Sequence, residues 1–252
     1  MKSSALIVAL SLLLGCAASA AADAPSDQFN LGNRHYEQKN YDSAVVVYTQ
    51  LVNQGLESAP LYFNLGNASF RSGDLGHAVL YYLRAQRLDP TDPDIAANLD
   101  FARRYTSVQM EGVALNPVSS LFESIVAPYR LSTLGWAASA FFFVLFAFLI
   151  ARFGYAWRGA LVRTGIWLSL ILLVTVSLLT TVKYHHDYII RRAVILAQES
   201  VVHTGPSDLS EKELDGAPGL IVEILAESGN YYNVLFENKR RGWIRKDQVA
   251  VV

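Results

Sequence analysis

A chain of 252 residues can form one large domain or two to three small ones. Hydrophobic residues make up 52% of it, which is too large a share for an ordinary soluble protein, so we expect part of the chain to lie in a lipid bilayer. The formal net charge of −1 gives no basic surplus, and no nucleic-acid partner is expected. Membrane and protein partners remain.

The N-terminus, residues 1–22, has the layout of a secretory signal peptide. A basic start at Lys2 precedes an apolar run from Ala5 to Leu14, and small residues follow it. The run is too short to cross a hydrocarbon core, which takes about 17–25 residues. We therefore expect this segment to direct export of the residues that follow.

Two fates of this segment stay open. Small residues up to Ala20 and Ala22 fit ordinary signal-peptidase cleavage, which would discard Cys16, the only cysteine of the sequence. The letters LLGC that end at Cys16 resemble a bacterial lipobox, in which the cysteine would carry lipid. Ordinary cleavage is favoured, because Leu14 is a poor residue before the lipobox glycine and later membrane helices would make a lipid anchor redundant. With either fate, no cysteine is available for a disulfide or a thiolate nucleophile.

An internal repeat is the most specific signal in the sequence. Residues 31–51 align with residues 65–85 at an offset of 34, and the matching pairs are Leu31/Leu65, Gly32/Gly66, Asn33/Asn67, Tyr36/Phe70, Ala44/Ala78 and Tyr48/Tyr82. These matches resemble the tetratricopeptide repeat, a pair of antiparallel helices joined by a turn. The resemblance implies a helical repeat domain over residues 25–109, with a last helix at residues 92–108 that caps the stack.

Helix packing accounts for the repeated small residues. Two antiparallel helices approach closely only where one of them offers a small residue, so we expect the two aligned glycines to face the two alanines, Ala44 and Ala78. The aromatic positions would then fill the wider gaps. The first repeat departs from the family pattern at Lys39, where the turn usually has glycine.

Two apolar segments without formal charge follow residues 110–130, which read as a linker or an interfacial segment. They lie at residues 131–151 and 164–182, and each is about long enough to cross a bilayer as a helix. The loop between them, residues 152–163, contains three arginines and no acidic residue. By the positive-inside rule this loop is cytoplasmic, which places both terminal domains on the exported side, as the signal peptide also requires.

The last part of the chain changes to strand periodicity after a linker at residues 183–192. Short runs rich in β-branched and aromatic residues alternate with turns that contain glycine. Together with the letters VVHTGPS at residues 201–207 and GWIRKDQV at residues 242–249, they resemble the bacterial SH3-like domain. The resemblance implies a small all-β barrel over residues 193–252.

No set of residues typical of an enzyme is found in the sequence. It has no glycine-rich phosphate loop, no serine with evident histidine and aspartate partners, and no histidine pair at the helical spacing of metal ligands. The cluster of His185, His186 and Asp187 is explained more simply by polar residues at a membrane surface than by a metal or a pH sensor. We therefore expect a non-enzymatic protein without a cofactor or a metal.

Candidate binding residues of the repeats lie on their first helices, which line the concave face of such a stack. They are Asn33, Arg34, Tyr36 and Asn67. In peptide-binding members of the tetratricopeptide family, asparagines at these positions often bond a ligand backbone. The alternative, that Asn33 and Asn67 only support the contact between helices, stays open.

Candidate binding residues of the C-terminal domain are aromatic. Tyr231, Tyr232 and Trp243 could form a groove for a proline-rich or cell-wall peptide. Alternation along a strand lets only one of the two tyrosines point outward, and Trp243 is as easily a core residue.

The order of the modules is similar to that of the BatE-type proteins of the bacterial aerotolerance operon, and the letters NLDFAR after the repeats support the likeness. This resemblance implies partners: membrane proteins with von Willebrand A domains and a MoxR-type ATPase. We therefore expect a scaffold in the bacterial inner membrane, with both terminal domains in the periplasm and a role in envelope stress. The alternative is a cell-wall tether whose SH3-like domain binds peptidoglycan.

Overall fold

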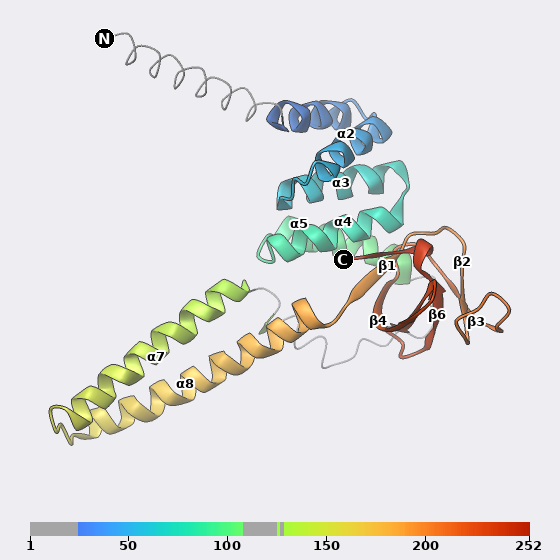
Figure 1. The fold of residues 1–252 in the computed structure, drawn as a ribbon. Coiled ribbons are helices and arrows are strands. Elements are labelled where there is room, and N and C mark those ends of the chain that lie inside the picture. The colour runs from blue at the N-terminus through green and yellow to red at the C-terminus, as the bar shows by residue number, and fades with distance from the viewer. Residues whose placement is uncertain (1–24, 108–124, 127–128) are drawn as a thin grey trace, which may run out of the picture.

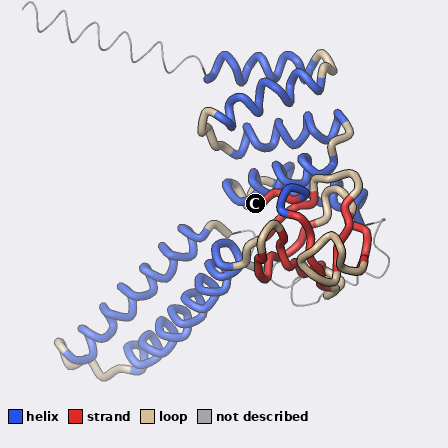
Figure 2. The backbone as a smooth tube through the Cα atoms, turned by 45° about the vertical axis from the view of Figure 1, so that its right-hand side comes forward, coloured by secondary structure: helices blue, strands red, loops and turns tan. Residues whose placement is uncertain are grey.

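The computed structural model describes residues 25–107, 125–126 and 129–252. Cys16, Ala20 and Ala22 lie outside the described residues, as does most of the predicted linker at residues 110–130. The described residues form a stack of helices, a long two-helix hairpin and a C-terminal antiparallel sheet (Figures 1 and 2). This arrangement confirms the predicted architecture of a helical repeat region, two apolar helices and a small β domain.

The repeat domain, residues 25–107, is a stack of antiparallel helices. Residues 25–37 are helical and contact the next helix through the rings of Phe29 and Tyr48. The helices that follow are α2 (Tyr41–Asn53), α3 (Ala59–Ser72), α4 (Leu75–Leu88) and α5 (Pro93–Ser107). Each packs against its neighbour along the chain, and their buried apolar faces form one continuous core.

The prediction that Gly32 and Gly66 face alanines is wrong. A Cβ atom on Gly32 would lie 2.4 Å from the ring of Tyr48, and one on Gly66 would lie 2.7 Å from the ring of Tyr82. The absent side chains therefore make room for a tyrosine ring against the first helix of each repeat. Ala44 remains fully buried in the core.

The turns of the two repeats differ in their chemistry. Gly73 ends α3 in the left-handed conformation, with φ of 90°, and Lys39, its equivalent in the first repeat, has φ of 60°. Asp74 then caps α4, because its carboxylate accepts a hydrogen bond from the backbone N–H of His77 at 3.1 Å. Asn40, its equivalent before α2, makes no such side-chain bond. The first turn is thus the more strained and the less well capped.

The hairpin consists of α7 (Leu131–Phe153) and α8 (Ala160–Tyr184), which continues as a π-helical segment, His185–Ile189. The two helices pack side by side, and both are long and apolar enough to cross a membrane. Their open ends lie at the same end of the hairpin, next to the other two domains (Figure 1).

The β domain, residues 192–252, is an antiparallel sheet of seven strands in the order β3-β2-β6-β5-β4-β1-β7. The strands are β1 (Arg192–Ile195), β2 (Ser200–His203), β3 (Lys212–Gly216), β4 (Ile221–Ser228), β5 (Tyr231–Phe236), β6 (Arg241–Arg245) and β7 (Val249–Val251). Alternate residues of these strands turn inward and form an apolar core that includes Val202, Val222, Val234 and Ile244.

The repeat domain and the β domain share a second apolar core. Val79 and Leu80 of α4 are buried in it together with Val194 of β1. The backbone at Leu196 approaches α4 so closely that a Cβ atom on Gly76 would lie 2.9 Å from its Cα atom. The two domains therefore pack as a protein interior does, although their sequences lie more than a hundred residues apart.

Polar contacts surround this shared core. The Arg84 guanidinium donates a hydrogen bond to the backbone carbonyl of Val251 at 3.1 Å. Arg103 of α5 forms an ion pair with Glu237, just after β5, at 2.8 Å. On the side of the hairpin, the side chain of Arg130, directly before α7, pairs with Asp89 after α4 at 2.9 Å. Side-chain contacts thus join the repeat domain to both other parts.

Candidate functional site

A Tyr–Asn–Asn triad occurs in each repeat and follows the 34-residue offset. The hydroxyl of Tyr48 donates to Asn33 Oδ1 at 2.7 Å, and the amide of Asn64 donates to the same oxygen at 3.0 Å. The second triad consists of Tyr82, Asn67 and Asn98, with distances of 2.7 Å and 2.8 Å to Asn67 Oδ1. Each triad ties the first helix of one repeat to its partner helix and to the first helix of the next repeat.

The triads leave amide groups available for a ligand. Because the two bonds in each triad converge on one oxygen, the Nδ2 groups of Asn33 and Asn67 remain as donors, and the Oδ1 atoms of Asn64 and Asn98 remain as acceptors. No hydrogen bond among the described residues uses these four groups. Donors and acceptors at this repeated spacing suit the backbone of an extended chain.

A pocket of about 170 Å³ opens over the first triad. We call the surface that contains this pocket the inner groove; the pocket is lined by Asn33, Tyr36, Glu37, Tyr48, Asn64 and Asn67. Burial raises the pKa of Tyr48 to about 12 and also raises that of Tyr82, so both hydroxyls remain protonated donors at neutral pH. The floor of the groove is therefore neutral and polar.

Two charged side chains lie at the rim of the groove. Glu37 is exposed beside the first pocket, and Arg71, its equivalent in the second repeat, is also exposed. Arg71 interacts with the side chain of Tyr36, and this interaction raises the pKa of Arg71 above its ordinary value. The groove thus presents one negatively charged and one positively charged side chain to a ligand.

The predicted residues of the repeats fall into two groups. Asn33, Tyr36 and Asn67 lie together in the inner groove. Arg34 is the equivalent of Ala68, which is fully buried against the preceding helices, so exposed Arg34 lies at the open N-terminal end of the stack. The structure shows the contacts between helices, which the amide oxygens of Asn33 and Asn67 support. Binding of a peptide by the amide nitrogens stays a prediction.

Sequence reasoning missed Glu37, Asn64, Arg71 and Asn98. The signal was present, because the alignment of residues 31–51 with 65–85 already pairs Glu37 with Arg71, and the same 34-residue offset outside it pairs Asn64 with Asn98. The alignment was used to find identical or similar residues within one pair of repeats. Glu37 and Arg71 differ in charge, and Asn64 and Asn98 lie outside the aligned blocks.

The three aromatic candidates of the β domain do not share one face. In the register of β5 and β6, Tyr231 is opposite Arg245, Tyr232 is opposite buried Ile244, and Asn233 is opposite Trp243. Side chains alternate along a strand, so Tyr231 and Trp243 project from one face of the sheet and Tyr232 from the other. Tyr232 packs on the core of the β domain, with the ammonium of Lys246 5.0 Å from its ring centre.

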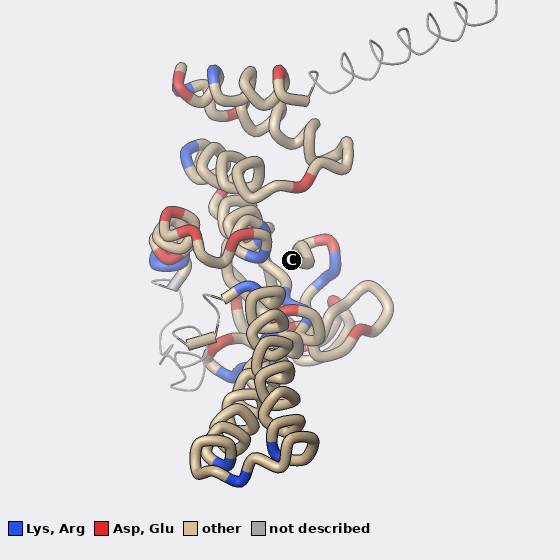
Figure 3. The backbone as a smooth tube through the Cα atoms, turned by 90° about the vertical axis from the view of Figure 1, so that its left-hand side faces the viewer, with Lys and Arg blue, Asp and Glu red and all other residues tan. Residues whose placement is uncertain are grey.

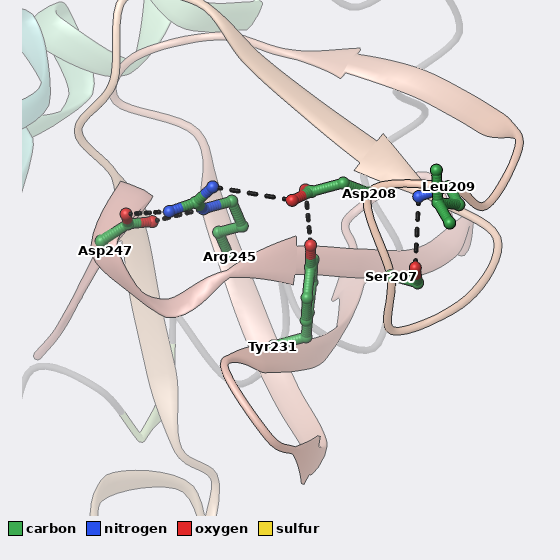
Figure 4. Close-up of polar contacts among 6 residues, drawn as sticks. All are labelled: Ser207, Asp208, Leu209, Tyr231, Arg245 and Asp247. Atoms are coloured by element: carbon green, nitrogen blue, oxygen red, sulfur yellow. Dashed lines mark hydrogen bonds and ion pairs between the residues drawn. The ribbon is translucent and has the colours of Figure 1, made fainter.

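Tyr231 is part of a polar network (Figure 4). Its hydroxyl donates to Asp208 in the loop between β2 and β3 at 2.5 Å, and this bond raises the pKa of Tyr231. Arg245 lies 3.8 Å from the same carboxylate and forms a closer pair with Asp247. The network holds the loop whose tip, Leu209, is 97% exposed.

The histidine cluster after α8 is organised by ion pairs. Asp187 contacts Lys183 at 2.9 Å and His186 at 3.2 Å. Within the described part of the chain, no group of three or more His, Cys, Asp or Glu side chains has the arrangement of a metal site.

Residues 59–92 match the tetratricopeptide repeat family. The match covers α3 and α4, the second of the two repeats that the internal alignment predicts. A comparison with curated proteins gave no match. The repeat is thus established as a tetratricopeptide unit, a class of module that serves interaction between proteins.

Proposed function

We propose that the protein is a non-enzymatic scaffold, anchored in a membrane, that holds protein partners in the inner groove of its repeats. The repeated Tyr–Asn–Asn triads support this function most directly. Their hydrogen bonds join the helices through one amide oxygen in each triad, and the other amide donors and acceptors form a row along the groove. A tetratricopeptide unit at residues 59–92 is consistent with such binding. The small β domain, SH3-like in sequence, would support the groove and add surface beside it.

The hairpin supports the proposed membrane arrangement. Both ends of α7 and α8 that connect to folded domains lie at one end of the hairpin, which favours a repeat domain and a β domain on the same side of the bilayer. The loop at the far tip of the hairpin is marked by basic residues without acidic ones (Figure 3). The positive-inside rule then assigns the tip to the cytoplasm of a bacterial cell and both domains to the periplasm.

The biological setting is inferred from the resemblance to BatE-type proteins. It favours a periplasmic role in an aerotolerance or envelope-stress complex of the inner membrane, with von Willebrand A domain proteins and a MoxR-type ATPase as partners. The architecture of repeats, hairpin and β domain is consistent with this assignment.

Photocrosslinking in native cells tests the groove as the binding site. A photoreactive phenylalanine analogue replaces Tyr36, which lines the groove. In a matched control the analogue replaces Val46, which is 57% exposed on the second helix of the same repeat. We expect crosslinked partner proteins from the groove position and none from the control. Equal adducts from both positions, or none from the groove, would overturn this function.

Cysteine labelling tests the membrane arrangement separately. After replacement of Cys16 by serine, single cysteines are placed at fully exposed Leu209 in the β domain and at Arg158 in the hairpin loop. A membrane-impermeant reagent added to cells with a permeabilised outer membrane should label the first and not the second. The opposite pattern would reverse the topology.

A further inference from the structure

The pocket over the first triad has an equivalent one repeat further along the groove. Each lining residue of the first pocket maps onto a residue 34 positions later: Asn33 onto Asn67, Tyr36 onto Phe70, Glu37 onto Arg71, Tyr48 onto Tyr82, Asn64 onto Asn98 and Asn67 onto Phe101. The triads show that the mapping holds in space, because their hydrogen bonds repeat to within 0.2 Å. The inner groove therefore contains two consecutive sites with the same polar floor.

The walls of the second site are aromatic. The ring centre of Phe70 lies 5.6 Å from that of Phe101 and 5.7 Å from that of Tyr105. The rings of Phe101 and Tyr105 are themselves 5.3 Å apart, and the two residues remain 49% and 55% exposed. The first site keeps one aromatic residue, Tyr36, at the position of Phe70, but Asn67 and Arg71 stand where the second site has Phe101 and Tyr105.

The exposed aromatic trio is open to a ligand. Phe101 and Tyr105 project from the free face of α5, while the opposite face of α5 is buried through Leu99 and Ala102. A cluster of aromatic rings rimmed by polar groups is typical of a binding surface, because covering it removes apolar area from water. The ring faces and edges accept another aromatic ring with specific geometry.

The two sites also carry opposite charge at equivalent positions. Glu37 at the first site attracts a cationic side chain, and Arg71 at the second site repels one. Arg71 also interacts with the side chain of Tyr36 at the first site, so its positive charge lies between the two sites. A ligand with one basic residue is therefore accepted in one position along the groove and not in the other.

We propose that the inner groove binds an extended segment of a partner protein with a lysine or arginine at the Glu37 site and an aromatic residue on the Phe70, Phe101 and Tyr105 trio. Neighbouring packed helices lie about 8–10 Å apart, and the trio lies on α3 and α5, one and two such spacings from the helix of Glu37. An extended chain advances about 3.3 Å per residue, so the two residues are about three to six positions apart. The backbone between them bonds the amides of the triads. This inference rests on the proposed function and names its ligand class.

Selection from a library of random dodecapeptides displayed on phage tests the proposal with the full chain in lipid nanodiscs. We expect enriched peptides to pair a basic with an aromatic residue about three to six positions away. Glu37→Lys should replace the basic residue by an acidic one in the enriched set, and Phe101→Asn should remove the aromatic preference. Val46→Lys, an exposed change outside the groove, should leave the selected pattern as it is.

The affinity of one enriched synthetic peptide supplies the second measurement. Glu37→Lys should weaken its binding about tenfold, and the effect should shrink at high salt. Circular dichroism of each variant confirms that its helices are intact. No common pattern, or an unchanged charge preference in Glu37→Lys, overturns the proposal.

The two failures can be told apart. If photocrosslinking from the Tyr36 position captures partner proteins while the selection gives no pattern, the scaffold function stands and the ligand class is wrong. If the groove position captures nothing, the function itself fails.

Discussion

The helices α2 and α4 occupy the same place in consecutive repeats, yet they meet different surroundings. In α2 only one face is buried, through Ala44, Tyr48 and Leu51. In α4 the equivalent face is buried against α3, and the opposite face is buried as well, against β1. The second helices of the two repeats thus differ in one respect: the outer face of α4 is covered by the β domain, and the outer face of α2 is not.

The outward residues account for this difference. Val46 is 57% exposed, and its equivalent Leu80 is 3% exposed. Asp42 in the first turn of α2 is replaced by Gly76 in α4, where only a hydrogen atom fits against the backbone at Leu196. The repeat pattern fixes the inner face of each helix, while the outer face is adapted to a neighbour from the far end of the chain.

The largest expected effect comes from truncating the docked face. Leu80→Ala should lower the free energy of unfolding by about 2–5 kcal/mol, because it leaves a cavity in the core that the two domains share. Val46→Ala, the matched change in α2, should stay within about 0.5 kcal/mol. Urea unfolding of the full chain in detergent, followed by circular dichroism, measures both. Similar losses in the two variants would contradict the asymmetry.

A smaller effect is expected from adding a single methyl group at the close contact. Gly76→Ala should destabilise the protein by about 1–3 kcal/mol, since its Cβ would lie 2.9 Å from backbone that cannot easily give way. Gly135→Ala in α7 is the control, because nothing lies within 4 Å of its Cβ position. A stabilising Gly76→Ala, the usual result in a helix, would show that the contact is loose.

The turn before α2 offers a change in the opposite direction. Lys39→Gly should stabilise the protein by about 1 kcal/mol, because Lys39 has φ of 60° and glycine adopts that conformation without a steric penalty. Gly73→Ala at the equivalent turn, with φ of 90°, should destabilise it by a similar amount. Equilibrium unfolding of the two variants gives the comparison, and an unchanged or lower stability of Lys39→Gly would argue against strain at that turn.

The smallest expected effect is the pH dependence of the α4 cap. Burial raises the pKa of Asp74, but hydrogen bonds from the side chain and backbone of His77 outweigh it, so the pKa lies below its ordinary value. A carboxylate with a lowered pKa stabilises the fold above its unfolded pKa near 3.8, and this contribution is lost as the pH falls below that value. Asp74→Asn should therefore flatten the decline in stability below pH 4. If stability falls equally below pH 4 in the wild type and in Asp74→Asn, the titration of Asp74 does not cause the fall.

Local pattern predicted much of the fold. The 34-residue offset placed the helices and the buried tyrosines, and length with hydropathy predicted the hairpin. The pairing of Gly66 with Tyr82 was missed, because a small residue can admit either a neighbouring helix or a ring, and a pattern does not distinguish them.

The docking of the β domain and half of the groove were not predicted. Arg84 and Val251 are 167 positions apart, and no periodicity links them. In the sequence, only the apolar residues on both faces of α4 indicate that a second element packs against this helix. In the groove, Asn33 and Asn67 were predicted from the family pattern, whereas Arg71 and the aromatic trio depend on which residues the stack brings together.

Amide hydrogen exchange of the full chain in nanodiscs tests most directly the central claim that the groove is presented by repeats docked rigidly on the β domain. Leu80→Ala is compared with wild type and with Val46→Ala. The shared core predicts that Leu80→Ala accelerates exchange in both α4 and β1, while Val46→Ala leaves β1 as it is. Faster exchange confined to α4, with β1 unchanged, would contradict the claim.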